Sequence, residues 1–216
     1  MARQFWLSDA QWAVLEPLLP RLGGKPRVDD RRVISGILHR YREGPCWRAV
    51  PAAYGPRTTL FNRFDRWSKK GIWQGLLAAL VACEDPPDSA MVDSTAVRAH
   101  RSAAGAKGGS RTKPSDGRAL LASVPAMRQL IADKAYDAND LRDFLAGQST
   151  EPVISPMPRR LERPAFDKGA YRTRNLIERA FCRLKGWRAI ATRYDKTARN
   201  FLAGICLAVA ITDWLH

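Results

Sequence analysis

Apolar residues recur at helical spacing through the first 83 residues of the chain, in four stretches separated by turns rich in Gly and Pro. In the first stretch, Trp12 and Leu15 follow Ser8, which forms a capping-box pattern with Gln11. This pattern predicts an all-α segment. The helices are expected to run from Ser8 to Pro20, from Asp29 or Asp30 to Gly44, from a cap at Thr58 or Thr59 to about Lys70, and from Ile72 to Cys83.

The third of these helices has an apolar face and a polar face. Leu60, Phe61, Phe64 and Trp67 are expected to face inward. The outer face mixes Arg, Lys, Asn and Thr, the side chains that contact phosphates and base edges, and helices joined by tight turns suit a helix-turn-helix. A small helical bundle with a basic, solvated surface is the alternative. The candidate DNA-binding residues are Arg57, Thr58, Asn62, Arg63, Arg66, Lys69 and Lys70.

The pattern changes after residues 84–89, whose acidic and Pro residues are typical of a linker. Short apolar runs that suit strands then alternate with helical stretches, as in an α/β domain. We therefore expect a helical DNA-binding domain at residues 1–83 and an α/β domain at residues 90–216. Its elements are expected to be strands at Ala90–Val97, Arg128–Asp133 and Glu151–Ser155, a helix capped by Asp137, basic loops at 102–113 and 156–168, and an apolar piece at Leu120–Val124.

The charge balance adds a partner to this picture. The 216 residues include 36 Lys and Arg against 21 Asp and Glu, for a net charge of +15. Such an excess indicates a polyanionic partner, nucleic acid first and an anionic membrane second. The start of the chain lacks the apolar region of a signal peptide. The apolar stretch Phe201–Leu215 is short for a membrane span, so we expect a buried helix in a cytoplasmic protein.

Cysteine and histidine usage limits the kind of metal site that the chain could form. The four cysteines are scattered without a C-x-x-C pair, which favours buried thiols over a zinc site or disulfides. His39, His100 and His216 are too far apart in sequence to suggest a local site. Any metal would be held by carboxylates, which suit hard ions such as Mg²⁺ or Mn²⁺. The cysteines are Cys46, Cys83, Cys182 and Cys206.

The stretch Tyr171–Lys185 contains no helix breaker and is expected to form one helix that ends at Gly186. At 100° per residue, Tyr171, Arg174, Glu178 and Lys185 fall within an arc of about 60°. A glutamate flanked by cations on a packed helix could bind a metal and a phosphate chain. The same spacing is also that of a solvated i,i+4 ion pair between Arg174 and Glu178, which the spacing alone favours.

Two aspartates lie in or at the end of expected strands, where a carboxylate is costly unless it is paired. With Glu178, Asp93 and Asp133 supply three acidic groups from three elements, as two-metal phosphoryl transfer requires. Each also has a structural interpretation: Asp93 as a turn former, Asp133 as a cap before Tyr136, and Glu178 as a surface ion pair. Asp137 competes with Asp133, but its position before a helical run favours an N-cap.

Several blocks of the chain, in order, resemble the DDE transposases of bacterial insertion sequences, the insertion-sequence four/five superfamily. Tyr171-x2-Arg174-x3-Glu178-x6-Lys185 is similar to their Y-x2-R-x3-E-x6-K signature. The strand of the family's first Asp is similar to Val92-Asp93-Ser94-Thr95, and that of its second Asp to Ala132-Asp133-Lys134-Ala135-Tyr136-Asp137. The segment from Arg193 to Phe201 resembles the one that follows the Glu helix. Residues 5–80 resemble the N-terminal DNA-binding module, with the matching positions Trp47-Arg48, Pro51 and Phe64-x2-Trp67.

The resemblance implies a ribonuclease-H-like fold with Asp93, Asp133 and Glu178 as the catalytic triad that binds Mg²⁺ or Mn²⁺. Such enzymes cut DNA at element ends with metal-activated water and join the 3′-hydroxyl to target DNA. The implied partner is double-stranded DNA, both element ends and target, bound by a homodimer in the bacterial nucleoid, with no small-molecule substrate. The contacts to the DNA backbone near the scissile phosphate would come from Tyr171, Arg174 and Lys185.

One spacing departs from the family pattern, because Asp93 and Asp133 are only 40 residues apart. Two antiparallel strands and usually a helix precede the second-Asp strand in that fold, and the basic loop leaves too few residues for them. We hypothesise an internal deletion of the second and third strands, which leaves the first strand and the second-Asp strand as neighbours. The alternatives are a truncated, catalytically defective transposase that only binds DNA, and a nuclease of the same fold.

Overall fold

The computed structural model describes residues 4–20, 29–83, 89–93, 95–103 and 127–215. It divides into two compact units. Unit 1 comprises Met1–Glu84, Val97–Gly108 and Arg183–His216, and unit 2 comprises Asp85–Ala96 and Gly109–Cys182. The two units differ from the predicted division into residues 1–83 and 90–216, because Arg183–His216 belong to the same unit as the first 84 residues. That boundary stays a prediction about functional domains.

Some predicted segments lie outside the described residues. These are the apolar piece Leu120–Val124, most of the linker at 84–89 and most of the basic loop at 102–113. The hypothesis of an internal deletion concerns this same part of the chain, so it stays a hypothesis.

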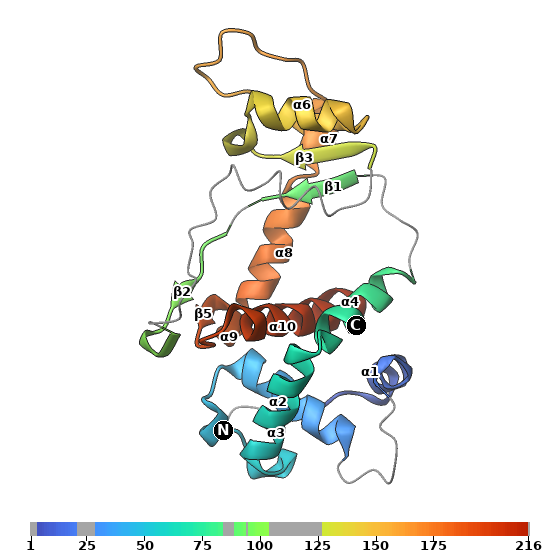
Figure 1. Ribbon diagram of the computed structural model, residues 1–216, viewed down its shortest axis with the longest axis vertical. Coiled ribbons are helices and arrows are strands. Elements are labelled where there is room, and N and C mark those ends of the chain that lie inside the picture. Colours follow the sequence, from blue (N-terminus) through green and yellow to red (C-terminus); the bar gives the residue numbers. More distant parts are fainter. Residues whose placement is uncertain (1–3, 21–28, 84–88, 94, 104–126, 216) are drawn as a thin grey trace. The chain divides into compact units, whose positions relative to one another are not determined.

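Unit 1 is built from helices, as the pattern of the first 83 residues predicted (Figure 1). The terminal apolar stretch also forms a helix that belongs to this unit. The α-helices are α1 (Asp9–Leu15), α2 (Asp30–Glu43), α3 (Arg57–Lys69), α4 (Ile72–Val81), α9 (Arg188–Ala191) and α10 (Ala198–Val209). Short 3₁₀ turns lie at Glu16–Leu18, Trp47–Ala49, Ala52–Tyr54 and Arg101–Ala103, and a π-helical turn at Ala210–Trp214 follows α10.

Local chemistry determines the start of α1 and both ends of α2. Ser8 Oγ accepts a hydrogen bond from the Gln11 backbone N–H at 3.2 Å, and the Gln11 side chain accepts one from the Ser8 N–H at 3.0 Å, which confirms the predicted capping box. Asp29 caps α2, and Gly44 ends it at φ 76°. The predicted cap of α3 at Thr58 or Thr59 is wrong, because α3 begins at Arg57, after Pro56, without a side-chain cap.

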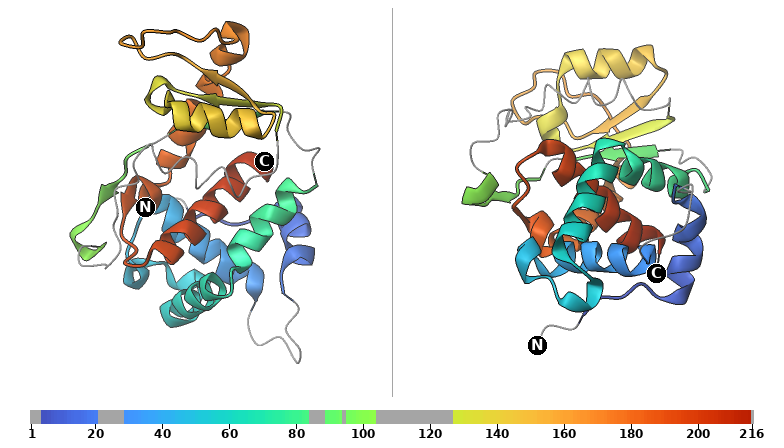
Figure 2. Two further views of the ribbon diagram at one scale, coloured as in Figure 1. Left: turned by 45° about the horizontal axis from the view of Figure 1, so that its top comes forward. Right: turned by 60° about the horizontal axis from the view of Figure 1, so that its bottom comes forward.

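The core of unit 1 forms around α10, which contacts α2, α3, α4 and α9 (Figure 2). Large aromatic side chains fill it, among them the fully buried Tyr41, Phe64, Trp67 and Trp73. The packing against α10 is so close that a Cβ at Gly204 would lie 2.1 Å from the Tyr41 ring. The expected burial of the terminal helix is thus confirmed, and none of the described helices is long and apolar enough to cross a membrane.

Unit 2 contains a parallel sheet in the order β1 (Ser89–Val92), β3 (Gln129–Ala132), β4 (Glu151–Ile154). Helix α6 (Asn139–Gly147) lies alongside this sheet (Figure 2) and buries Leu141 and Leu145. Helices α7 (Lys168–Arg172) and α8 (Asn175–Lys185) follow β4 in the chain. Strands alternating with helices confirm the mixed α/β character that the sequence predicted.

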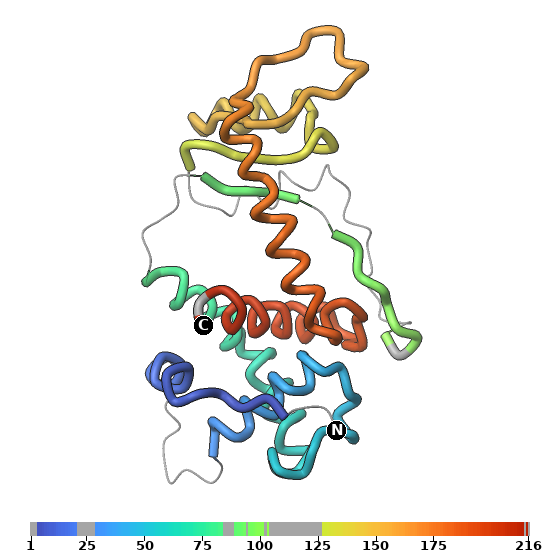
Figure 3. The backbone as a smooth tube through the Cα atoms, turned by 180° about the vertical axis from the view of Figure 1, so that it is seen from behind, coloured from blue at the N-terminus to red at the C-terminus, as the bar shows by residue number. Residues whose placement is uncertain are grey.

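A second pair of parallel strands belongs to unit 1. Residues Arg98–Ala99 form β2, which pairs with β5 at Thr192–Arg193; both are labelled in Figure 1, and Figure 3 traces the same backbone from behind. The single strand expected at Ala90–Val97 is therefore wrong in length, because pairing with β3 ends at Val92 and β2 pairs with a different partner.

Candidate active site

The two candidate aspartates follow neighbouring parallel strands. Val92 and Ala132 are register partners at the ends of β1 and β3, and Asp93 and Asp133 are the next residues on each strand. Because the two strands run in the same direction, both carboxylates belong to one edge of the sheet. The Asp93 side chain is 14% exposed, so its charge needs a nearby partner.

Arg174 supplies that partner and extends the cluster to Glu178. Its Nη1 lies 3.4 Å from Asp93 Oδ2, while its Nη2 donates a hydrogen bond to Glu178 Oε1. One guanidinium therefore lies between two of the three candidate carboxylates. The i,i+4 ion pair between Arg174 and Glu178 that the spacing predicted is confirmed, and Glu178 remains half exposed.

Asp133 has a structural partner of its own. Its Oδ1 accepts a hydrogen bond from the Ala135 backbone N–H at 2.9 Å and caps the 3₁₀ turn Lys134–Tyr136. The interpretation of Asp133 as a cap before Tyr136 is confirmed. In the part of the chain that the structure describes, no three His, Cys, Asp or Glu side chains lie close enough to hold a metal ion. The register brings Asp93 and Asp133 together, and Arg174 connects Glu178 to Asp93.

The expected single helix over Tyr171–Lys185 is interrupted. The Arg174 N–H bonds to the Tyr171 carbonyl at 3.1 Å and the Leu176 N–H to the Thr173 carbonyl at 2.9 Å, so the chain makes i→i+3 bonds between α7 and α8. The prediction of one continuous helix is therefore wrong, and the 100° spacing from which the polar stripe was predicted does not continue across this turn. Arg174 lies in the turn, where its side chain reaches Asp93.

The other two residues of the signature lie on either side of that turn. Tyr171 belongs to α7, is half-buried and packs edge-to-face on Phe166 at 5.3 Å. Lys185 is the last residue of α8 and is exposed. Their contacts to DNA stay predictions.

Asp137 is not the N-cap that the sequence suggested. The residue before α6 is Ala138, and the fully buried Asp137 carboxylate instead accepts bonds from Arg142 at 2.8 Å, Arg160 at 3.1 Å and the Met157 N–H at 2.7 Å. Burial disfavours the charged carboxylate, but these three donors outweigh it and lower the pKa of Asp137 below its ordinary value. The residue fixes the loop after β4 and takes no part in the candidate site.

Most of the predicted DNA-binding residues of α3 and its end are exposed, and their contacts to DNA stay predictions. Arg63 is the exception, since it is 6% exposed, pairs with Asp30 and lies over the Trp67 ring at 4.8 Å. Phe61, expected inside, is 41% exposed and packs edge-on against Trp47, with 5.7 Å between the ring centres. The remaining candidates are exposed: Arg57, Thr58, Asn62, Arg66, Lys69 and Lys70.

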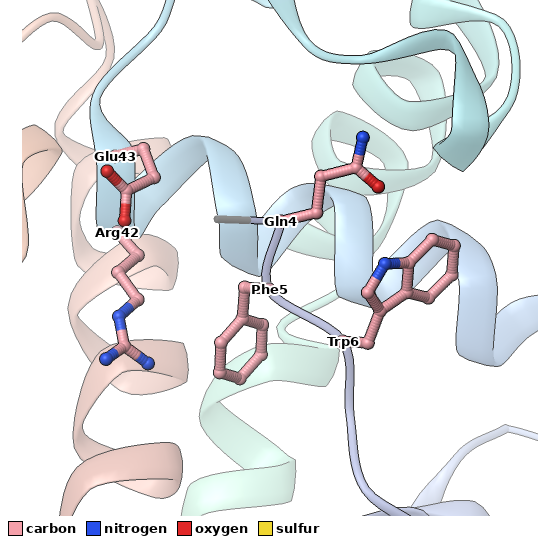
Figure 4. Close-up of a pocket in the computed structure, with 5 residues that line it drawn as sticks. All are labelled: Gln4, Phe5, Trp6, Arg42 and Glu43. Atoms are coloured by element: carbon pink, nitrogen blue, oxygen red, sulfur yellow. The ribbon is translucent and has the colours of Figure 1, made fainter. Parts of the chain in front are cut away.

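Two further features bear on ligand chemistry. The expectation of buried thiols holds for Cys206 alone, because Cys46, Cys83 and Cys182 are exposed. A pocket beside the start of the chain is lined by Gln4, Phe5, Trp6, Arg42 and Glu43, with the Arg42 guanidinium 5.3 Å from the Phe5 ring centre (Figure 4). It contains none of the candidate residues.

A family model described as "Putative transposase of IS4/5 family" matches residues 7–77. The protein y4sN of Sinorhizobium fredii, itself uncharacterized, is 37% identical over 106 residues, which cover 47% of this chain and 82% of that protein. The "Putative transposase for insertion sequence element IS6501" of Brucella ovis is 38% identical over 98 residues, 45% of this chain and 75% of the relative.

A third relative, the "Insertion element IS402 uncharacterized 16.2 kDa protein" of Burkholderia cepacia, is 34% identical over 107 residues, 43% of this chain and 73% of its own length. No solved structure matches the chain. Asp93, Asp133 and Glu178 lie outside the region that the family model matches. The relatives are matched over most of their length, and with the family model they show that the chain belongs to the IS4/5 family of insertion-sequence transposases.

Proposed function

We propose that this transposase binds the ends of its insertion element and catalyses DNA cleavage and strand transfer with Asp93, Asp133 and Glu178. The observation that carries the proposal is the register of β1 and β3, which brings Asp93 and Asp133 to one sheet edge. The parallel order β1-β3-β4 suits a ribonuclease-H-like sheet that lacks its second and third strands. Homodimer formation on DNA and association with the nucleoid belong to the same proposal.

The donor set fits a hard divalent ion. The three side chains offer only carboxylate oxygens, which Mg²⁺ and Mn²⁺ prefer, and the Arg174 guanidinium already places a positive charge between Asp93 and Glu178. Asp93, Asp133 and Glu178 would hold the metal. Bound there, divalent ions would activate the attacking oxygen and stabilise the leaving oxygen of the phosphodiester.

Arg174 explains how a metal-binding set can exist without three ligands gathered around one point in the described residues. Its guanidinium pairs with both the Asp93 and the Glu178 carboxylates. A DNA phosphate is an alternative anion for this arginine, and arginine binds phosphate oxygens with two parallel donors. Movement of Arg174 from the two carboxylates to a phosphate would leave both Asp93 and Glu178 available and hold the phosphate beside them.

DNA binding is assigned to the exposed face of α3. Asn62 and Thr58 can contact base edges, and Arg66 and Lys69 can contact phosphates. The net charge of +15 supports the same partner.

A second candidate function is DNA binding without catalysis. Two observations favour it: Asp133 caps a turn, and no three ligands gather around one point in the part of the chain that the structure describes. Such a protein would occupy element ends and interfere with an intact transposase.

Cleavage of DNA that carries the element ends, with Mg²⁺ or Mn²⁺, separates the two candidates. The nucleotide sequence on both sides of the gene is determined first, and inverted repeats found there would supply the substrate. The proposal expects strand cleavage by the wild type and its loss in Glu178→Ala, with DNA binding retained in both. Retained binding without cleavage by the wild type would favour the second candidate.

A further inference from the structure

The segment that follows β5 lies beside α3, although about 130 residues separate them in the sequence. Asp65 on α3 joins the two: its Oδ1 accepts from Arg199 Nη2 at 3.3 Å and from Asn200 Nδ2 at 3.2 Å, and its Oδ2 pairs with Lys69 Nζ at 2.7 Å. All of these residues belong to unit 1. The first turn of α10 is therefore bonded to the side of α3 that carries Asp65 and Lys69.

A buried anchor fixes this segment. Asp195 is 8% exposed, accepts a hydrogen bond from the Tyr41 hydroxyl at 3.0 Å and lies 3.5 Å from the Arg40 guanidinium. Burial and the nearby Asp195 charge raise the pKa of Tyr41 well above its ordinary value, so the hydroxyl remains a donor. The backbone on either side is thus held against α2, while Lys196 and Arg199 remain exposed.

The combined surface is strongly basic. Six exposed cations lie on α3, at its end and on the distant segment, and two of them, Lys69 and Arg199, pair with the same carboxylate, Asp65. The cations are Arg57, Arg66, Lys69 and Lys70 from α3 and its end, and Lys196 and Arg199 from the distant segment. A duplex carries a phosphate charge about every 1.7 Å along its axis, so a cation row wider than one helix can follow its backbone.

We propose that Lys196 and Arg199 bind phosphates of the same DNA duplex that α3 contacts, so that the DNA-binding surface is assembled from both ends of the chain. This inference rests on the proposed DNA-binding function of α3. The proposal gives a role to the segment from Arg193 to Phe201, which resembles a segment of the transposase family. The buried Asp195 holds this segment in position.

The test is a salt titration of binding to a short fluorescent duplex of mixed sequence, followed by anisotropy. Each lost phosphate contact lowers the slope of log K against log salt by about 0.9. Lys196→Ala with Arg199→Ala should therefore reduce the slope by about 1.8 and weaken binding roughly 30-fold at about 0.15 M salt. The matched control is Arg42→Ala with Arg188→Ala, which removes the same charge from two exposed arginines of unit 1.

An equal loss of slope in both double variants would overturn the inference, because net charge alone would then explain it. The double variant Arg66→Ala with Lys70→Ala distinguishes failure of this inference from failure of the proposed DNA binding by α3. If this α3 variant loses slope while the Lys196 and Arg199 variant keeps the wild-type slope, α3 binds DNA and the inference is wrong. No binding by the wild type would overturn both.

Discussion

Asp93 and Arg174, 81 residues apart in the sequence, form an ion pair at 3.4 Å. The same arginine donates to Glu178, so a strand end and a helix start are joined through one guanidinium. Removal of one partner from such a shared pair leaves the others uncompensated, which makes Arg174 the residue whose substitution most directly tests the candidate site.

Arg174→Gln is expected to increase the affinity of the DNA-free protein for Mn²⁺. The substitution removes the cation that competes for Asp93 and Glu178, and a partly exposed ion pair is worth about 1 kcal/mol, or about fivefold in affinity. Titration of the protein with Mn²⁺, followed by the electron paramagnetic resonance of the unbound ion, measures the Kd without turnover. Arg172→Gln, an exposed arginine at the end of α7, is the control for charge. Equal affinities in the wild type and Arg174→Gln would exclude competition by Arg174.

Asp137→Asn is expected to lower the free energy of unfolding by about 3 kcal/mol, because it leaves the Arg142 and Arg160 guanidinium groups without a buried counter-charge. Urea unfolding at neutral pH measures the loss, with the exposed Asp143→Asn as control. A loss no larger than that of the control would mean that the buried pairs contribute little.

The same pair predicts an acid dependence. The pKa of Asp137 is lower in the folded chain than its ordinary value of 3.8, so its contribution to stability is fully present above that value and is lost as the pH falls through the folded pKa. Unfolding at a series of acid pH values should therefore show a smaller loss of stability for Asp137→Asn than for the wild type. Parallel curves for the two proteins would contradict the assignment.

The sequence predicted well those features that depend on residues close together in the chain, and less well those that depend on partners far apart in the chain. The Ser8 capping box, the Asp29 cap and the three strands of unit 2 follow from neighbouring residues, and these were predicted. The turn at Arg174 was missed because side-chain pattern does not separate i→i+3 from i→i+4 bonding within an otherwise helical stretch.

Long-range partners account for the other differences. Arg63 lies at the edge of the apolar face of α3, and it is buried where it pairs with Asp30, 33 residues earlier. The docking of α10 into unit 1 depends on the Tyr41 ring meeting Gly204, a contact that no local pattern reports. Asp93 and Asp133 were identifiable individually, but their pairing needed the strand register.

Arg63 and Arg66 are expected to behave differently although both were candidate DNA contacts. Arg66→Ala removes an exposed cation and should lower the salt slope of DNA binding by about 0.9 with little effect on stability. Arg63→Ala should leave the slope unchanged and cost about 3 kcal/mol of unfolding free energy, since it leaves Asp30 without its partner. Anisotropy titrations and urea unfolding of both variants measure the contrast. A lowered slope in a fully folded Arg63→Ala protein would restore Arg63 to the DNA-binding set.

Gly204→Ala tests whether the terminal helix is an integral part of unit 1. The added Cβ would lie 2.1 Å from the Tyr41 ring, so the ring must move, and with it the hydroxyl that donates to Asp195. Overpacking of this kind costs about 3 kcal/mol, and it should also weaken DNA binding if the segment at Lys196 and Arg199 shifts with Asp195. Gly75→Ala on α4 is the matched control, because nothing lies within 4 Å of its Cβ and alanine favours a helix by about 0.5–1 kcal/mol. Urea unfolding that shows equal stabilities for the two variants would mean that α10 does not pack against Tyr41 in solution.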